Sequence, residues 1–216
     1  MTATIVYLQP EAVHLLTDGA MFAPDGAFVA LKQKVQIAAH QSAAYAARGP
    51  DMYSGLLSVV MSQAQGDFDR LVTEFAGMCT TAHAAMLAAV KSGTPVPGDP
   101  AMVDAVLIGH SLARGFCAFA VSSYPEEGHP AWTLRPLGGA APLAYVSPMD
   151  SMLEVNLRMQ RVNLWDGSPD VEKHGLAIMR EQRSTGIVGG FCQITSILPS
   201  GVFSRVLERW PMAPEN

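Results

Sequence analysis

Residues 2–19 read TATIVYLQPEAVHLLTDG, two apolar and β-branched runs separated at residues 9–11. Such runs, broken by a proline-containing turn, are typical of two antiparallel strands joined as a hairpin. Antiparallel pairing brings the first and last residues of a hairpin to the same edge of the sheet. The sequence therefore predicts that Asp18 lies beside Thr2.

Two lysines follow the next turn of the chain. That turn is expected at residues 23–26, which read APDG, and residues 27–39 are predicted to form a strand. Lys32 and Lys34 are two positions apart, so on a strand their side chains share one face. Either lysine could reach the pocket of Thr2 and Asp18. Lys34 is the one that keeps the interval of sixteen residues that separates Thr2 from Asp18.

These three residue types suit nucleophilic catalysis by a chain terminus. A threonine hydroxyl attacks only when a base takes its proton, and a free α-amine, with a pKa of ~7.7–8.0, is suited to that task. A buried lysine ammonium lowers the effective pKa of the hydroxyl, and an aspartate keeps the lysine charged. Thr2, Asp18 and Lys34 are therefore candidate catalytic residues, provided that Met1 is removed.

The same residues resemble the proteasome β-subunit family, and in particular the peptidase subunit of the bacterial ATP-dependent heat-shock protease. The resemblance covers most of the chain and is carried by Thr2, by Asp18 followed by Gly19, and by the QKV stretch at residues 33–35. It implies a threonine-type N-terminal nucleophile (Ntn) hydrolase that cleaves amide or peptide bonds. It also implies a four-layer αββα sandwich.

A glycine completes the candidate site by resemblance. Residues 43–49 read AAYAARG, a strand of small residues that ends in glycine just before a helical segment. In the family, the matching glycine gives its backbone N–H to the oxyanion hole, which implies this role for Gly49. One such donor contributes about 2.7–4 kcal/mol in the transition state.

The remaining segments predict an α+β chain, and the resemblance implies two antiparallel sheets covered by helices. A helix is expected over residues 67–91 with a shorter one before it, and strands over 104–110 and 115–123 with a third near Trp132. Two later helices are indicated by Ser147-Pro148 and Ser168-Pro169, with Asp150 and Asp170 in their first turns. Closing strands are expected over 189–197 and 202–208. Residues 1–216 are expected to form one domain.

Composition limits the classes of partner. Hydrophobic residues make up 49% of the chain and charged residues 15%, a lean surface that favours a homo-oligomer. The net charge of −5 comes without any basic run, which argues against nucleic acid. The sequence lacks an apolar run of about 20 residues and a signal-peptide pattern, so we expect a cytoplasmic protein. The partner remains open between an ATPase and a larger particle.

The cysteines and histidines show no metal-ligand spacing, so neither a metal nor another cofactor is predicted. Cys79, Cys117 and Cys192 are expected to be reduced core residues. A pairing of Cys117 with His110 across the strand hairpin is the alternative nucleophile.

A second function remains open because of residues 184–190, STGIVGG. The family has a serine and an aspartate shortly before this glycine pair, and they help to hold the threonine amine. The matching positions here are Gly186 and Val188, whose side chains accept no hydrogen bond. The alternative is therefore a catalytically inactive Ntn-fold protein that serves as a structural or assembly subunit of a multi-subunit, phage-type or other particle.

Overall fold

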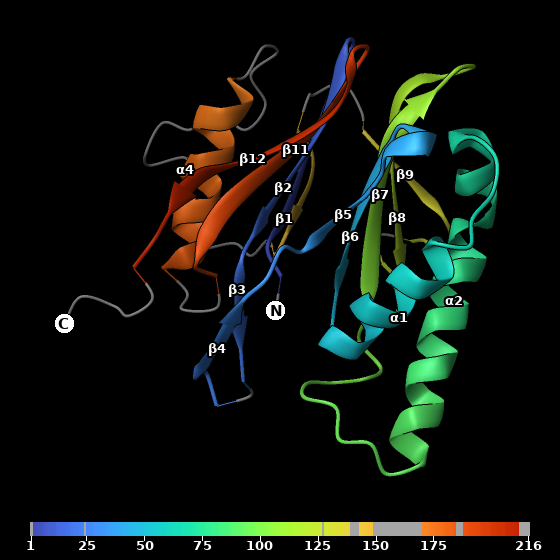
Figure 1. Ribbon diagram of the computed structural model, residues 1–216, viewed down its shortest axis with the longest axis vertical. Helices are drawn as coiled ribbons and strands as arrows, with labels where there is room; N and C mark the ends of the chain where they lie inside the picture. Colours follow the sequence, from blue (N-terminus) through green and yellow to red (C-terminus); the bar gives the residue numbers. More distant parts are fainter. Residues whose placement is uncertain are drawn as a thin grey trace.

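The computed structural model describes residues 2–23, 25–126, 128–138, 143–148, 170–184 and 188–211. Four layers lie one on another: helix α4, a first five-stranded sheet, a second five-stranded sheet, and helices α1 and α2 (Figure 1). All strand pairs within both sheets are antiparallel. The predicted α+β sandwich of two antiparallel sheets is thereby confirmed.

The first sheet is built around the N-terminal hairpin. Its strand order is β10-β1-β2-β11-β12. The strands are β1 (Thr4–Gln9), β2 (Ala12–Asp18), β10 (Leu143–Ser147), β11 (Phe191–Leu198) and β12 (Gly201–Arg209). Thr4 pairs with Thr17, so the end of β2 lies beside the start of β1, as the sequence predicts. Strand β10 was not anticipated from the sequence.

The second sheet has the order β5-β6-β7-β8-β9. Its strands are β5 (Val35–Ala38), β6 (Ala43–Arg48), β7 (Asp104–Ser111), β8 (Gly115–Ser122) and β9 (Arg135–Leu137), and a short 3₁₀ helix (Ala39–Gln41) links β5 to β6. Strand β9 is the strand expected near Trp132. Two short strands, β3 (Ala20–Phe22) and β4 (Phe28–Leu31), form a separate hairpin that extends beyond the sheets (Figure 1).

The single strand predicted for residues 27–39 is wrong. The segment contains β4 and β5 with residues 32–34 between them. Strand β4 pairs with β3, whereas β5 pairs with β6 in the second sheet. The two strands pair in different sheets, so the chain is interrupted between them. Lys32 and Lys34 lie in this interruption and belong to neither strand.

The described helices are α1 (Asp51–Met61), α2 (Phe68–Lys91) and α4 (Val171–Arg183). The N-cap of α2 is Asp67, which accepts a hydrogen bond from the Arg70 amide. Helix α4 is capped by Asp170, which accepts from the Lys173 amide; this corrects the expected placement of Asp170 in the first turn. The helix predicted after Ser147-Pro148 lies outside the described residues.

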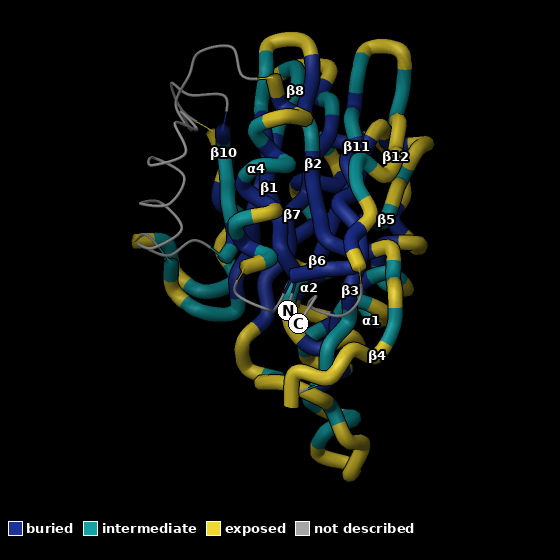
Figure 2. Tube along the Cα trace, turned by 90° about the vertical axis from the view of Figure 1, so that its left-hand side faces the viewer, coloured by how far each residue is buried: buried dark blue, intermediate teal, exposed yellow. Residues whose placement is uncertain are grey.

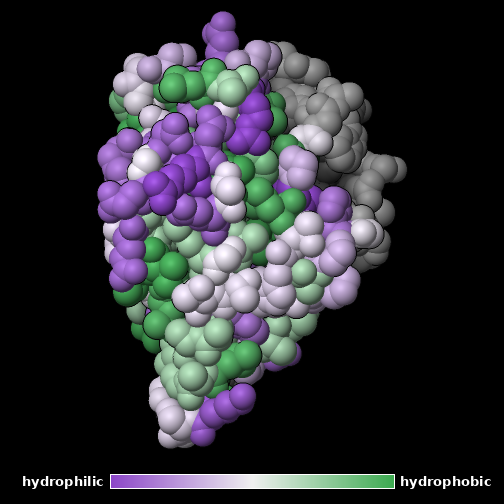
Figure 3. Space-filling view, turned by 90° about the vertical axis from the view of Figure 1, so that its right-hand side faces the viewer, coloured by the Kyte–Doolittle hydropathy of each residue, from purple (hydrophilic) through white to green (hydrophobic). Residues whose placement is uncertain are grey.

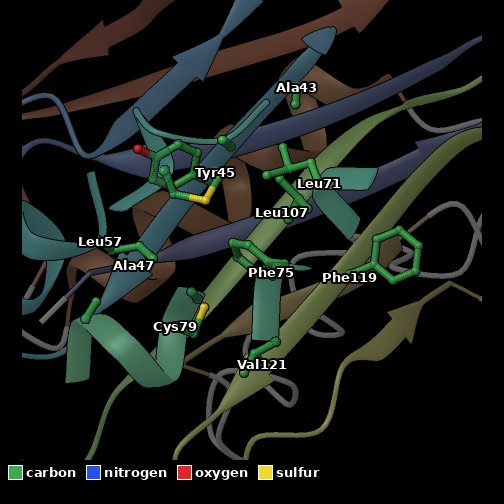
Figure 4. Packing of buried hydrophobic residues seen from close by; sticks show 14 of the residues in the cluster. Ala43, Tyr45, Ala47, Leu57, Leu71, Phe75, Cys79, Leu107, Phe119 and Val121 are labelled. Carbon is green, nitrogen blue, oxygen red and sulfur yellow. The ribbon is translucent and has the colours of Figure 1, made fainter. Parts of the chain in front are cut away.

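Three apolar interfaces hold the four layers together. One lies between α1, α2 and the second sheet, one between the two sheets, and one between the first sheet and α4. Figure 4 shows Leu71, Phe75 and Cys79 of α2 against residues of the second sheet, such as Leu107. Figure 2 shows the buried residues concentrated along the central strands.

The proposed pairing of Cys117 with His110 is not found. In the β7–β8 ladder, His110 is opposite Phe116 and Cys117 is opposite Gly109. Residues directly opposite share a face, and the next position points to the other face. The imidazole and the thiol therefore lie on opposite faces of the sheet. Among the cysteines, Cys79 and Cys192 are buried and Cys117 is half-buried, and all three are free.

Close packing at Gly109 gives a test of the α2 interface. A Cβ atom at Gly109 would lie 2.0 Å from a ring carbon of Phe68. We expect Gly109→Ala to lower the free energy of unfolding by about 1–3 kcal/mol through overpacking. Gly77 is exposed within α2 and has no atom within 4 Å of such a Cβ.

Gly77→Ala is therefore the matched control, expected to raise the free energy of unfolding by about 0.5–1 kcal/mol. Urea unfolding measures both variants. Equal effects of the two alanines would contradict the packing of Phe68 against Gly109.

Candidate active site

Asp18 is the fully buried centre of the candidate site. It ends β2, and its carboxylate accepts hydrogen bonds from the backbone amides of Ala3 (2.9 Å), Ala20 (3.3 Å) and Gly189 (3.4 Å). Its exposed fraction is 0%. Asp18 therefore fixes the residue next to Thr2 in the chain, as hairpin pairing predicts.

Lys34, and not Lys32, contacts Asp18. The Lys34 ammonium donates to Asp18 Oδ1 at 2.8 Å, and 8% of its side chain is exposed. Lys32 instead forms an ion pair with Asp51 in the first turn of α1, and 30% of its side chain is exposed. Both lysines lie in the break between β4 and β5, where their side chains reach different carboxylates. The alternative left open by the sequence is decided by these contacts.

The surroundings of Lys34 act on its pKa in two opposing directions. Burial lowers the pKa of the ammonium below its ordinary value, because a charged group loses its hydration. The Asp18 carboxylate opposes this effect through its charge and its hydrogen bond, and the neighbouring Lys32 adds to the lowering. The net result is a lysine whose proton is held less firmly than in water.

Thr2, Lys34 and Gly49 all line one cavity of about 590 Å³, here called the Thr2 cavity. Thr2 lies just before β1 and is 7% exposed. Asp18 lies behind Lys34 and is not part of the wall. The site is thus a buried carboxylate, a lysine in contact with it, and a threonine that lines the same cavity as the lysine.

Gly49 joins the end of β6 to the start of α1. Its φ of +120° lies in a region that favours glycine. A Cβ atom there would come within 2.7 Å of a Val103 methyl carbon and 3.1 Å of the Met102 carbonyl oxygen. Both the backbone conformation and the space therefore require glycine, and its backbone forms part of the cavity wall.

The late glycine pair contacts the Asp18 region through the backbone of Gly189. The Gly189 amide donates to Asp18, and the Gly189 carbonyl accepts from the Gly19 amide at 3.1 Å. Val188 is 3% exposed and packs in the apolar interface below α4. Gly186 lies outside the described residues.

A polar group that the sequence reading missed lines the same cavity. Arg48 at the end of β6 pairs in register with Asp104 at the start of β7, and the two form an ion pair of 3.4 Å. The Tyr124 hydroxyl donates to the same Asp104 oxygen, Oδ2, at 2.9 Å. These three residues are called the Arg48 cluster. The sequence signal that could have indicated this pair is a charged residue at the end of β6 and one of opposite sign at the start of β7.

Burial raises the pKa of the Asp104 carboxyl, and the nearby Arg48 cation opposes this rise. Burial, followed by the charge of Asp104, raises the pKa of Tyr124 to about 12. Within the described residues, no group of three or more His, Cys, Asp or Glu side chains is placed to hold a metal ion. No described helix is long and apolar enough to cross a membrane.

The fold is similar to that of Anbu proteins of known structure. One similar solved structure is a Gly-1 mutant of Anbu from Hyphomicrobium sp. strain MC1, at 13% identity and a TM-score of 0.66 over 96% of this chain and 87% of that chain. Another is Anbu from Yersinia bercovieri, described as an ancestral β-subunit, at 11% identity and a TM-score of 0.66 over 96% of this chain and 88% of that chain. A further Anbu structure from Hyphomicrobium sp. strain MC1 matches at 12% identity, with a TM-score of 0.66 over 95% of this chain and 87% of that chain. No family model and no curated protein matches the sequence.

Removing the buried carboxylate should be costly. Asp18→Asn leaves the Lys34 ammonium in a buried position without its counter-charge, and we expect a loss of about 3–5 kcal/mol in the free energy of unfolding. Asp51→Asn removes the partner of Lys32, where both side chains are largely hydrated, and should cost less than about 1 kcal/mol. Urea unfolding at pH 7 compares the two. Similar losses would contradict a buried, structurally required Asp18.

The lowered pKa of Lys34 predicts a pH dependence. Between that lowered value and the ordinary one near 10.5, the unfolded chain binds more protons at this residue than the native chain does. The contribution of Lys34 to the free energy of unfolding should therefore rise with pH across this window. The measurement is the difference in unfolding free energy between the unmodified protein and Lys34→Met from pH 7 upward. A difference that falls as pH rises would contradict the prediction.

Proposed function

We propose that this protein is a threonine-type Ntn hydrolase that cleaves amide or peptide bonds after removal of Met1. The observation that carries the proposal is the Lys34–Asp18 pair: it is buried, it is bonded to the backbone beside Thr2, and its lysine lines the same cavity as Thr2. The narrower resemblance to the bacterial heat-shock protease subunit rests on Asp18 followed by Gly19.

In the proposed reaction, the Thr2 hydroxyl oxygen attacks the carbonyl carbon of the amide, and its proton passes to the Thr2 α-amine. The oxygen of the tetrahedral intermediate accepts a hydrogen bond from the Gly49 amide. The ammonium then protonates the leaving nitrogen as the C–N bond breaks, which leaves an ester on Thr2. Water, deprotonated by the amine, cleaves the ester and restores the hydroxyl.

Lys34 and Asp18 act on the nucleophile through electrostatics. A cation near the hydroxyl favours the alkoxide that develops during attack, and Asp18 keeps that cation near Thr2. Because the pKa of Lys34 is lowered, its proton can also respond to charge that develops beside it. These roles follow from the contacts of Lys34 with Asp18 and from its place in the cavity wall.

We also propose that the protein is cytoplasmic and forms a homo-oligomer. Large hydrophobic side chains are exposed on several elements: Phe28, Val29, Leu31, Ile37, Val59, Met102, Leu112, Phe203 and Val206. The side of the molecule with α1 and α2 shows hydrophobic areas between hydrophilic ones (Figure 3). Contact with further subunits would cover such areas.

One observation favours the alternative, an inactive Ntn-fold assembly subunit. Val188 is packed in the apolar interface at a position where the family has a polar side chain. If Asp18 and its backbone partners alone cannot hold the threonine amine in place, the fold would persist without hydrolysis. Function depends on the site and not on the fold, so chemistry must decide between the two.

The deciding experiment is intact-mass spectrometry of the purified protein before and after incubation with a threonine-directed epoxyketone or β-lactone. The hydrolase proposal predicts loss of Met1 and one covalent adduct per chain. Thr2→Ala should form no adduct, and Thr4→Ala, which changes the next threonine along the chain, should form it as the unmodified protein does. A retained Met1 with no adduct would instead support the assembly subunit.

A further inference from the structure

The Arg48 cluster is a charged part of the Thr2 cavity that the proposed chemistry does not use. Arg48 lies directly before Gly49 in the chain, and all three members of the cluster line the cavity. The proposed nucleophile and a guanidinium group thus belong to the wall of one cavity. A substrate bound for attack by Thr2 would therefore share the cavity with Arg48.

The guanidinium of Arg48 keeps open donors. It carries five N–H groups, and its ion-pair contact among the described residues runs from Nη1 to Asp104 Oδ2 at a long 3.4 Å. Its Nε also lacks a hydrogen-bond partner there, but this atom is buried and does not face a ligand. The Arg48 side chain is 17% exposed and lines the cavity.

Asp104 divides its contacts between this cation and a hydroxyl group. One of its oxygens, Oδ2, is shared between Arg48 and the Tyr124 hydroxyl. A carboxylate from a ligand in the cavity could thus compete with Asp104 for the Arg48 guanidinium.

The other two cations of the cavity have closer partners. Lys34 contacts Asp18 at 2.8 Å, and Lys32 is in close contact with Asp51. A guanidinium can bind a carboxylate through two parallel hydrogen bonds, which a lysine ammonium cannot do. Arg48 is therefore the cation of this cavity that is best suited to bind an anionic group.

We propose that Arg48 is a specificity-determining residue that binds a carboxylate group of the ligand in the Thr2 cavity. The inference rests on the proposed function only in treating that ligand as the substrate of Thr2. The carboxylate can come from an acidic side chain or from the C-terminus of a peptide. Asp104 and Tyr124 position the guanidinium.

Isothermal titration calorimetry with the Thr2→Ala protein tests the binding without hydrolysis. The probes are three N-acetylated pentapeptides: AAEAA with a C-terminal amide, AAQAA with a C-terminal amide, and AAQAA with a free C-terminal carboxylate. At least one of the two acidic peptides should bind roughly ten times more tightly than the neutral one, the usual effect of a hydrogen-bonded charge pair. Comparing the two acidic peptides identifies the source of the carboxylate.

Substitutions assign the preference to Arg48. In the Thr2→Ala background, Arg48→Met should abolish it, whereas Lys32→Met, which removes the nearby cation paired with Asp51, should leave it intact. Thermal unfolding shows whether each variant is folded. If Arg48→Met does not fold, Arg48→Lys, which keeps the charge but loses the planar fork, should lower the preference.

Equal binding of all three peptides, no binding of any, or a preference that survives the change of Arg48 would overturn the proposal. A missing Thr2 adduct with the inhibitor would count against the hydrolase alone, because the calorimetric preference does not require chemistry at Thr2.

Discussion

The ion pair between Asp18 and Lys34 is the contact on which the candidate site depends. A buried charge is tolerated only when partners replace its lost hydration. Asp18 obtains these partners from the Lys34 ammonium and from the amides of Ala3, Ala20 and Gly189. These groups belong to four separate segments of the chain. One carboxylate therefore fixes the residue beside Thr2, the start of β3, the lysine segment and the turn before β11.

The apolar interfaces explain why this polar centre lies at the end of the strands. Between the sheets, the middle of each strand contributes apolar side chains such as Leu15 and Val106. The charged residues Asp18, Arg48 and Asp104 stand at strand ends. There the ladder stops and the Thr2 cavity begins. Layers of apolar contact thus supply a rigid frame, and the loops at its edge supply the chemistry.

Two kinds of electrostatic environment meet in the Thr2 cavity. The Lys34–Asp18 pair is short and enclosed, and it suits a role in tuning a neighbouring hydroxyl. The Arg48–Asp104 pair is longer, and both residues line the cavity, which suits contact with a ligand. Val188, which precedes the glycine whose amide binds Asp18, lies in the apolar interface with α4. The activity therefore depends on the Lys34–Asp18 and Arg48–Asp104 pairs and does not follow from the fold alone.

The sequence by itself determined the strand–turn–strand start, the long helix α2, the α+β class and the candidates Thr2, Asp18 and Lys34, because these follow from local periodicity and spacing. Only the tertiary structure decided that Lys34 and not Lys32 meets Asp18, that residues 27–39 divide between two hairpins, and that β10 joins the first sheet. It also brought Arg48 to Asp104. The reason is physical: strand partners and buried charge pairs join residues far apart in the chain, and a local pattern carries no information about which distant partner will be there.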